Sequence, residues 1–96
     1  MEPVNQKVKV NGIILDAMVD TGSAVSLIKK CHVPLNCVDY QNKKVIECVH
    51  GDQKQHPQAE LVVEIDGVKY LLKMVVVENL PCDVILGWDV PVWVEL

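Results

Sequence analysis

Branched aliphatic side chains dominate this 96-residue sequence, and they narrow the range of folds open to it more than any other feature. The chain contains 19 Val and 6 Ile but only 3 Ala, and it has no Phe. Val and Ile lose rotamer freedom in helices and pack well on a pleated sheet. The composition therefore predicts an all-β protein with an aliphatic core.

The length suits one small domain, and we expect a single domain over residues 1–96. Half of the residues are hydrophobic, which is enough to support a folded core. A chain of this size buries only about 60–65% of its extended surface, so one copy has little material for a deep cleft. A cleft with two walls would need a partner.

The charge balance and the hydropathy of the sequence argue against nucleic-acid and membrane partners. Thirteen acidic residues stand against nine Lys and no Arg, for a net charge of −4. Phosphate backbones are bound by clustered positive charge, usually with Arg, so nucleic acid is a poor candidate. The longest purely aliphatic stretch is 74–77, and the first ten residues contain no apolar leader segment. We expect no membrane association and a cytoplasmic location.

The four Cys residues do not indicate a metal site. They lie at positions 31, 37, 48 and 82, and no two of them have the CxxC spacing of structural zinc sites. Disulfides are disfavoured in a chain without a secretion signal. We therefore expect free thiols, no metal and no cofactor.

Turn residues between apolar runs mark the strands. Asn11-Gly12 and Asp66-Gly67 are favoured two-residue hairpin turns. A polar hairpin around residues 50–52 has a second arm without an apolar face, so it should project into solvent. Residues 1–7 are expected to be a loose lead-in, residues 29–44 a surface connection with a strand near 37–40, and Trp88 the start of a short helical turn stopped by Pro91. The expected strands are 7–10, 13–19, one through Val25 to Ile28, 45–49, 53–58, 59–65, 68–77, one just before Gly87, and one near the C-terminus.

The segment AMVDTGSAVSLI at 17–28 carries the clearest chemical signal. Asp20 directly follows an apolar strand and precedes Thr21 and Gly22. This order places a carboxylate on a tight loop, where backbone N–H groups and hydroxyls can hold it and a glycine permits close approach. In isolation the same residues are more often a simple turn.

VDTGSAVSLI resembles the active-site loop of pepsin-like and retroviral-type aspartic proteases. The second signature of these proteins, two apolar residues and a glycine late in the domain, is matched by Ile85-Leu86-Gly87. More narrowly, DTGSAVSLI, CVHGD and DVILGWDV resemble the protease domain of gypsy-type retrotransposon polyproteins. The resemblance implies a small closed β-barrel-like half-lobe with a flap hairpin and at most one short helix. It also implies an intracellular endopeptidase, within retroelement particles, that processes a polyprotein.

The mechanism implied by the resemblance uses two facing carboxylates that share one proton and activate a water. This chain contains a single DTG, so it supplies half of such a site. The expectation is a two-fold symmetric homodimer in which Asp20 of each copy meets at the axis. An alternative is a noncatalytic dimerisation or peptide-binding module on the same fold, and a third reading is an unrelated monomeric β-barrel.

Residue roles carry over position by position from the resemblance. Thr21 is expected to buttress the paired loops, Ser23 to support the carboxylate through its hydroxyl, and Val49, His50, Gly51 and Asp52 to form the flap. The implied catalytic residue is Asp20, its support is Thr21, Gly22 and Ser23, and the substrate-binding residues are Met18, Gly22, Ala24, Val25, Val49, His50, Gly51, Asp52 and Ile85.

Two departures from the retroviral pattern stand out. Many members place Arg after the late glycine and Asp shortly after DTG as a buried ion pair, whereas this chain has Trp88 and Ala24 there. Since both charges are absent together, an apolar contact is expected in their place. Only nine residues follow Gly87, so the terminal elements that join retroviral dimers are expected to be shortened or rearranged.

Overall fold

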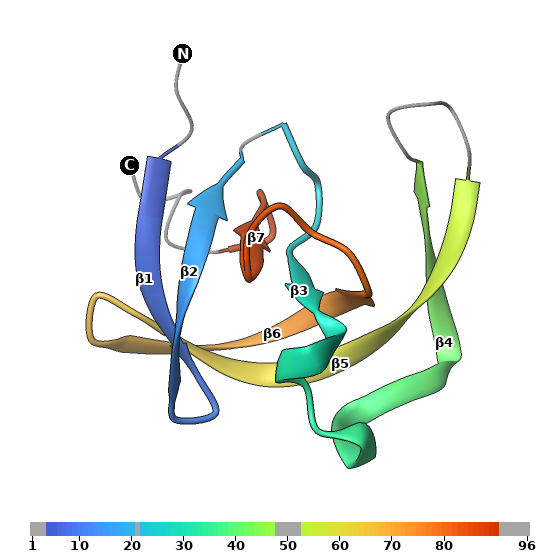
Figure 1. Cartoon of the computed structure of the whole chain (residues 1–96), viewed down its shortest axis with the longest axis horizontal. Helices are drawn as coiled ribbons and strands as arrows, with labels where there is room; N and C mark the ends of the chain where they lie inside the picture. The colour runs from blue at the N-terminus through green and yellow to red at the C-terminus, as the bar shows by residue number, and fades with distance from the viewer. Residues whose placement is uncertain (1–3, 21, 48–52, 91–96) are drawn as a thin grey trace.

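The structure, a computed structural model, describes residues 4–20, 22–47 and 53–90 (Figure 1). These residues form seven strands and two short 3₁₀ turns, with no α-helix among them. The all-β fold class predicted from the composition is therefore confirmed. The elements are β1 (Val4–Val10), β2 (Ile13–Val19), β3 (Leu27–Lys29), η1 (Lys30–His32), η2 (Leu35–Cys37), β4 (Val38–Glu47), β5 (Gln53–Ile65), β6 (Val68–Val77) and β7 (Val84–Leu86).

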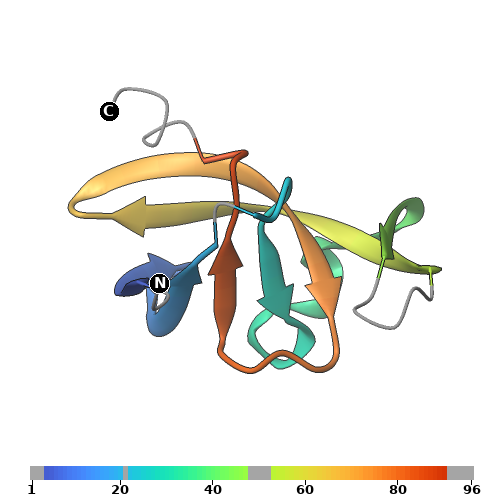
Figure 2. The ribbon, with the colours of Figure 1, turned by 90° about the horizontal axis from the view of Figure 1, so that it is seen from above.

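Six of the seven strands close into a small barrel. Their order is β1-β2-β7-β3-β6-β5, and β5 pairs back with β1 through Lys9↔Glu64 and Val10↔Val63. The seventh strand, β4, pairs with β5 outside this ring. Figures 1 and 2 show β4 and the first part of β5 extending away from the barrel as one long hairpin. The closed barrel expected from the resemblance is confirmed.

Two tight turns set the register of the barrel hairpins. Asn11 and Gly12 both have positive φ, at 48° and 83°, and Asp66 and Gly67 have 51° and 81°. Turns with positive φ at both central residues match the twist of the strands that they join. The predicted β1–β2 and β5–β6 hairpins therefore form where the sequence indicates.

The barrel interior is aliphatic. Every second residue of β5 from Ala59 to Ile65 is buried, as the alternation of strand side chains requires. All three residues of β7 are buried, because other strands flank it on both edges and core side chains cover it. Burial of this apolar surface is the main stabilising contribution to such a fold.

Three local expectations from the sequence were wrong. β1 begins at Val4, inside the expected lead-in, because Asn5 and Gln6 pair with Met18 and Ala17 of β2. Residues 29–44 are not a plain surface connection, because they contain Lys29 of β3, both 3₁₀ turns and the start of β4, with an irregularity between Asp39 and Lys44. The strand expected near 37–40 is confirmed as the start of β4. Trp88 and Asp89 form a turn and not a short helix.

The described part of the chain contains no helix of the length and apolarity needed to cross a membrane. The strand expected near the C-terminus lies outside the described residues.

Candidate active site

The DTG segment and the late apolar-apolar-Gly segment meet at one end of the barrel. β2 and β7 are parallel neighbours, with Met18 opposite Ile85 and Val19 opposite Leu86. The Asp20 N–H continues this pairing and donates to the Leu86 carbonyl oxygen at 2.9 Å. Two segments separated by more than 60 residues in the sequence therefore hold Asp20 at the end of a sheet.

The Asp20 carboxylate lies on a tight turn. The Gly22 N–H donates to its Oδ1 at 3.0 Å, and the Ser23 N–H donates to the Asp20 carbonyl oxygen at 3.1 Å. A Cβ at position 22 would lie 3.2 Å from Oδ1, which is closer than most such contacts, so glycine permits this approach. Asp20 is exposed in the single chain. It is thus an oriented carboxylate that faces solvent.

Ser23 holds the loop and not the carboxylate, which corrects the expectation from the resemblance. Its hydroxyl donates to the Val25 carbonyl oxygen at 2.7 Å. Its own carbonyl oxygen accepts from the Trp88 N–H at 2.9 Å. The backbone folds so that the hydroxyl reaches two residues forward, a local bond that is common for Ser in turns. Ser23 therefore fixes the path from the loop into β3.

Gly87 explains why the late motif ends in glycine. A Cβ there would lie 2.5 Å from the Val25 carbonyl oxygen and 2.6 Å from the Ser23 carbonyl oxygen. Real Cβ atoms essentially never come so close to another heavy atom, and backbone atoms cannot swing away as a side-chain end can. The chain after β7 can therefore pass beside the catalytic loop only with glycine at this position.

Ser26 and Asp89 form a second connection between the DTG segment and the residues that follow β7, and sequence reasoning missed it. Ser26 is fully buried. Its N–H and its hydroxyl donate to the Asp89 carboxylate at 2.9 and 2.6 Å, and the same hydroxyl accepts from the Gly87 N–H at 3.1 Å. Two features of the sequence could have indicated this connection. They are a single Ser inside the apolar run VSLI and an Asp two residues after Gly87.

This tie lies close in the sequence to positions 24 and 88, where the resemblance would place a charged pair. Ala24 and Trp88, between which an apolar contact was expected, are both exposed, and that contact stays a prediction. The carboxylate of Asp89 on Ser26 joins the two segments, together with the Trp88 N–H on the Ser23 carbonyl oxygen. It satisfies the buried hydroxyl without burying a charge completely, because Asp89 itself remains exposed.

The expected substrate-binding residues fall into two groups. Met18 is partly buried and lies opposite Ile85, which is 7% exposed, and Val25 is partly buried on the segment that leaves the catalytic loop. These three residues and the exposed Ala24 and Gly22 surround Asp20 in the chain and in the sheet. Thr21, Val49, His50, Gly51 and Asp52 lie outside the described residues.

A third cluster lies near the start of β7. The His32 Nε2 is 2.9 Å from Asp83 Oδ1, and the Asp16 N–H donates to Asp83 Oδ2 at 3.2 Å. The hydrogen bond with His32 is the largest cause that lowers the pKa of Asp83, and the bond from Asp16 lowers it further. The Lys29 N–H also donates to the Asp83 carbonyl oxygen at 3.0 Å. This cluster anchors β7 and does not touch Asp20.

Metal ligation has no support in the described residues. Among them, no group of three or more His, Cys, Asp or Glu side chains is arranged to hold a metal ion. Cys31, Cys37 and Cys82 are free thiols, and Cys48 lies outside the described residues.

Comparisons with known proteins agree with this geometry. The family model described as "Retroviral aspartyl protease" matches residues 2–91. The solution structure of the simian foamy virus (mac) protease superposes with a TM-score of 0.71 and 17% sequence identity, over 96% of each chain. No curated protein sequence matches significantly. At this identity the solved structure supports the fold alone. The family model covers both motifs that meet at Asp20. The chain belongs to the retroviral aspartyl protease family.

Proposed function

We propose that this chain is an aspartic endopeptidase whose active site forms between two copies, with Asp20 from each. The observation that carries the proposal is the Asp20 carboxylate, oriented by the Gly22 N–H and exposed beside the end of β7. The chain contains one DTG and therefore one half of a two-carboxylate site. A symmetric dimer supplies the second half with an identical loop.

The chemistry follows from placing two such carboxylates together. Two like charges about 3 Å apart cannot both ionise, so the pair holds one proton. The charged Asp20 takes a proton from a water whose oxygen attacks the scissile carbonyl carbon. The protonated Asp20 of the other copy hydrogen-bonds the carbonyl oxygen, and the C–N bond then breaks as the leaving amine is protonated.

The substrate class that we propose is a polyprotein of a gypsy-type retroelement, cleaved inside the cell. The support is the likeness of DTGSAVSLI, CVHGD and DVILGWDV to such protease domains. An extended peptide would lie across the loop from Gly22 to Val25 and pair with its backbone as an added strand.

The test is cleavage of a fusion polyprotein by the wild type, Asp20→Asn and Asp66→Asn over about pH 4 to 7. Loss of the catalytic carboxylate should lower the rate at least ~10²-fold, because acid–base groups contribute about 10²–10⁴. Asp66→Asn is the matched control, since Asn tolerates the positive φ of that remote turn. The wild-type rate should follow a bell-shaped pH profile, because the mechanism needs one carboxylate of the pair charged and the other protonated.

Two outcomes would contradict the proposal. If the wild type and Asp20→Asn both leave every substrate uncut while both bind peptide, the noncatalytic binding module is the correct function. If sedimentation shows only monomer at high concentration, even with a pepstatin-like inhibitor present, the shared two-copy site is wrong.

A further inference from the structure

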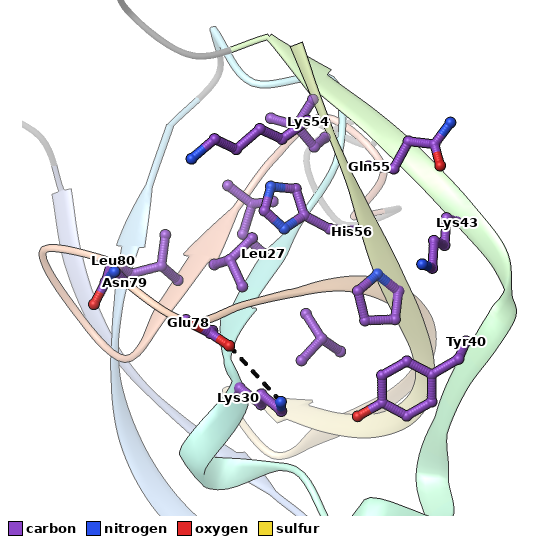
Figure 3. A pocket seen from close by; sticks show the side chains of 14 residues that line it. Leu27, Lys30, Tyr40, Lys43, Lys54, Gln55, His56, Glu78, Asn79 and Leu80 are labelled. Atoms are coloured by element: carbon purple, nitrogen blue, oxygen red, sulfur yellow. Dashed lines mark ion pairs between the residues drawn. The ribbon is translucent and has the colours of Figure 1, made fainter. Parts of the chain in front are cut away.

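A cleft of about 730 Å³ lies between the β4–β5 hairpin and the body of the barrel (Figure 3). Its barrel side is formed by Leu27 of β3, Val76 of β6 and the segment that follows β6. Its hairpin side includes Ile46 of β4. The cleft is therefore apolar at its centre and open along the hairpin.

Positive charge gathers on the hairpin side of this cleft. Lys43 of β4 and Lys54 and His56 of β5 line it, and Figure 3 shows Lys54 extending from β5 into the space between the hairpin and the barrel. The one carboxylate among the lining residues, Glu78, is 3.8 Å from the ammonium group of Lys30. Within residues 4–20, 22–47 and 53–90, neither Lys43 nor Lys54 makes an ion pair. Two uncompensated cations thus face an apolar cleft in a protein of net charge −4.

The sheet connects this cleft to Asp20. Leu27 lies opposite Ile85 of β7, and Ile85 lies opposite Met18 of β2, two residues before Asp20. Neighbouring strands are separated by about 4.8 Å, so Leu27 lies ~10 Å across the sheet from Met18. An extended peptide advances about 3.3 Å per residue. A peptide cut at Asp20 therefore reaches the cleft about three or four residues from the cut bond.

We propose that this cleft is a subsite for an acidic residue of the substrate, Glu or Asp, on one side of the cleaved bond. The methylene groups of the substrate side chain would contact Leu27 and Ile46. Its carboxylate would pair with Lys54, which lies directly opposite Ile46 on the paired strands, and Lys43 would add to the positive potential of the cleft. A Lys or Arg at the same position of the substrate would be repelled. The inference rests on the proposed function, because it assigns the specificity of the same site.

The chemistry of the lining favours a carboxylate over a purely apolar side chain. An apolar side chain would cover Leu27 and Ile46 but would leave two ammonium groups at the edge of a filled cleft with less water around them. A carboxylate offsets this desolvation. Charged groups at the rim of a site chiefly set specificity, which is the property assigned to them here.

The test begins with a pooled peptide mixture digested by the wild type, which identifies the best substrate. Versions of that substrate are then made with Glu, Gln or Lys at each of the first four positions on either side of the cut. At one position kcat/KM should favour Glu over Gln by about 3- to 10-fold at low salt, and the preference should shrink as salt is added. Lys at that position should be cut more slowly than Gln.

Matched variants identify the groups responsible. Lys43→Gln/Lys54→Gln should reduce the Glu-to-Gln ratio to about one, since both cations are gone. Lys9→Gln/Lys69→Gln removes the same charge from exposed positions of β1 and β6 and should keep the wild-type ratio. Thermal unfolding of both double variants checks that they fold.

Binding separates this inference from the protease proposal. In Asp20→Asn, the Glu peptide should shift the backbone amide resonances of Ile46 and Lys54 more strongly than the Gln peptide does. If the wild type cuts Glu, Gln and Lys peptides equally at every position, the acidic subsite is wrong and the protease stands. If no peptide in the mixture is cut, the protease proposal fails, and the subsite fails with it because the inference rests on that activity.

Discussion

Gly87 and Asp89 determine how closely the chain after β7 approaches the catalytic loop. The backbone of Gly87 passes the carbonyl groups of Ser23 and Val25 with no room for a Cβ. Two residues later, Asp89 accepts two hydrogen bonds from the buried Ser26. One residue acts by having no side chain and the other by its charge, and both position the segment that carries Asp20.

Gly87→Ala should destabilise the fold by about 2–3 kcal/mol, because the added methyl group meets backbone atoms and forces a shift. Urea unfolding measures the effect. The control is Gly12→Ala, at a φ of 83° with nothing within 4 Å of the new Cβ, which should cost only about 1 kcal/mol. Equal costs for the two variants would show that the close approach at Gly87 is not the constraint.

Asp89→Ala should cost about 2–3 kcal/mol, since it leaves the N–H and hydroxyl of a fully buried Ser26 without their charged acceptor. Asp89→Asn keeps one acceptor oxygen and should cost less. Asp16→Ala breaks an exposed ion pair with Lys7 and should cost at most about 1 kcal/mol. Thermal unfolding of the three variants ranks them, and an Asp89→Ala protein as stable as Asp16→Ala would contradict the tie.

At the scale of elements, the position of the short strand β7 decides the position of the site. β7 has three residues and lies between β2 and β3, so its position decides where Leu86 receives the Asp20 N–H. Its start is anchored by Asp83, which contacts Asp16 of β2, Lys29 of β3 and His32 of η1. Three elements thus converge on one side chain and its backbone.

The contacts of Asp83 predict how the stability of the folded protein changes at acidic pH. The lowered pKa of Asp83 means that the folded protein binds fewer protons than the unfolded chain, so its stabilising effect is complete above the ordinary Asp pKa of about 4. The effect is lost as pH falls through the lower folded-state pKa. His32→Gln replaces a ring that can carry charge with a neutral amide, so it weakens the largest cause of the lowering, the hydrogen bond to Asp83, and removes the charge of the ring. The variant should therefore lose less stability than the wild type on acidification below about pH 4.

Chemical denaturation at a series of pH values measures this difference. His56→Gln, on β5, is the matched control because its ring does not contact Asp83 in the described residues, and it should keep the wild-type acid dependence. Parallel curves for the wild type and His32→Gln would show that the contact does not contribute.

At the scale of the whole molecule, the proposed dimer would have an exposed aromatic beside its shared site. Trp88 is 52% exposed, and its N–H donates to the Ser23 carbonyl oxygen, so it lies next to the catalytic loop. Large aromatic residues at the centre of an interface often contribute most of its binding energy. Trp88 is therefore the described residue best placed to join two copies around Asp20.

Trp88→Ser should raise the dimer dissociation constant at least ~10-fold, which corresponds to about 1.4 kcal/mol. Sedimentation equilibrium measures the constant, and specific activity should fall on dilution at a correspondingly higher protein concentration. Leu71→Ser removes a similarly exposed apolar side chain, 65% exposed on β6, and should leave the constant unchanged. Equal constants for Trp88→Ser and the wild type would remove Trp88 from the interface.

Much of the fold could be predicted locally. Excess Val and Ile favours strands, and Asn11-Gly12 and Asp66-Gly67 specify hairpin turns through backbone preferences that need no distant partner. The two ends of β4 were predicted as separate strands, near 37–40 and at 45–49. The continuous strand between them could not be predicted, because its polar residues have no periodicity and it extends only through its pairing with β5.

The candidate site also has a part that could be predicted from the sequence and a part that could not. Asp20, Gly22 and the late Ile85-Leu86-Gly87 could be identified in the sequence because each motif is contiguous. The Ser26–Asp89 tie, the clash that requires Gly87, and the positive cleft with Lys43 and Lys54 emerged only in three dimensions. Each joins side chains or backbone atoms that lie many residues apart. By itself the sequence determined strand propensity, turns and the identity of the carboxylate. The tertiary structure decided which groups surround it, because packing brings together residues whose spacing along the chain carries no signal.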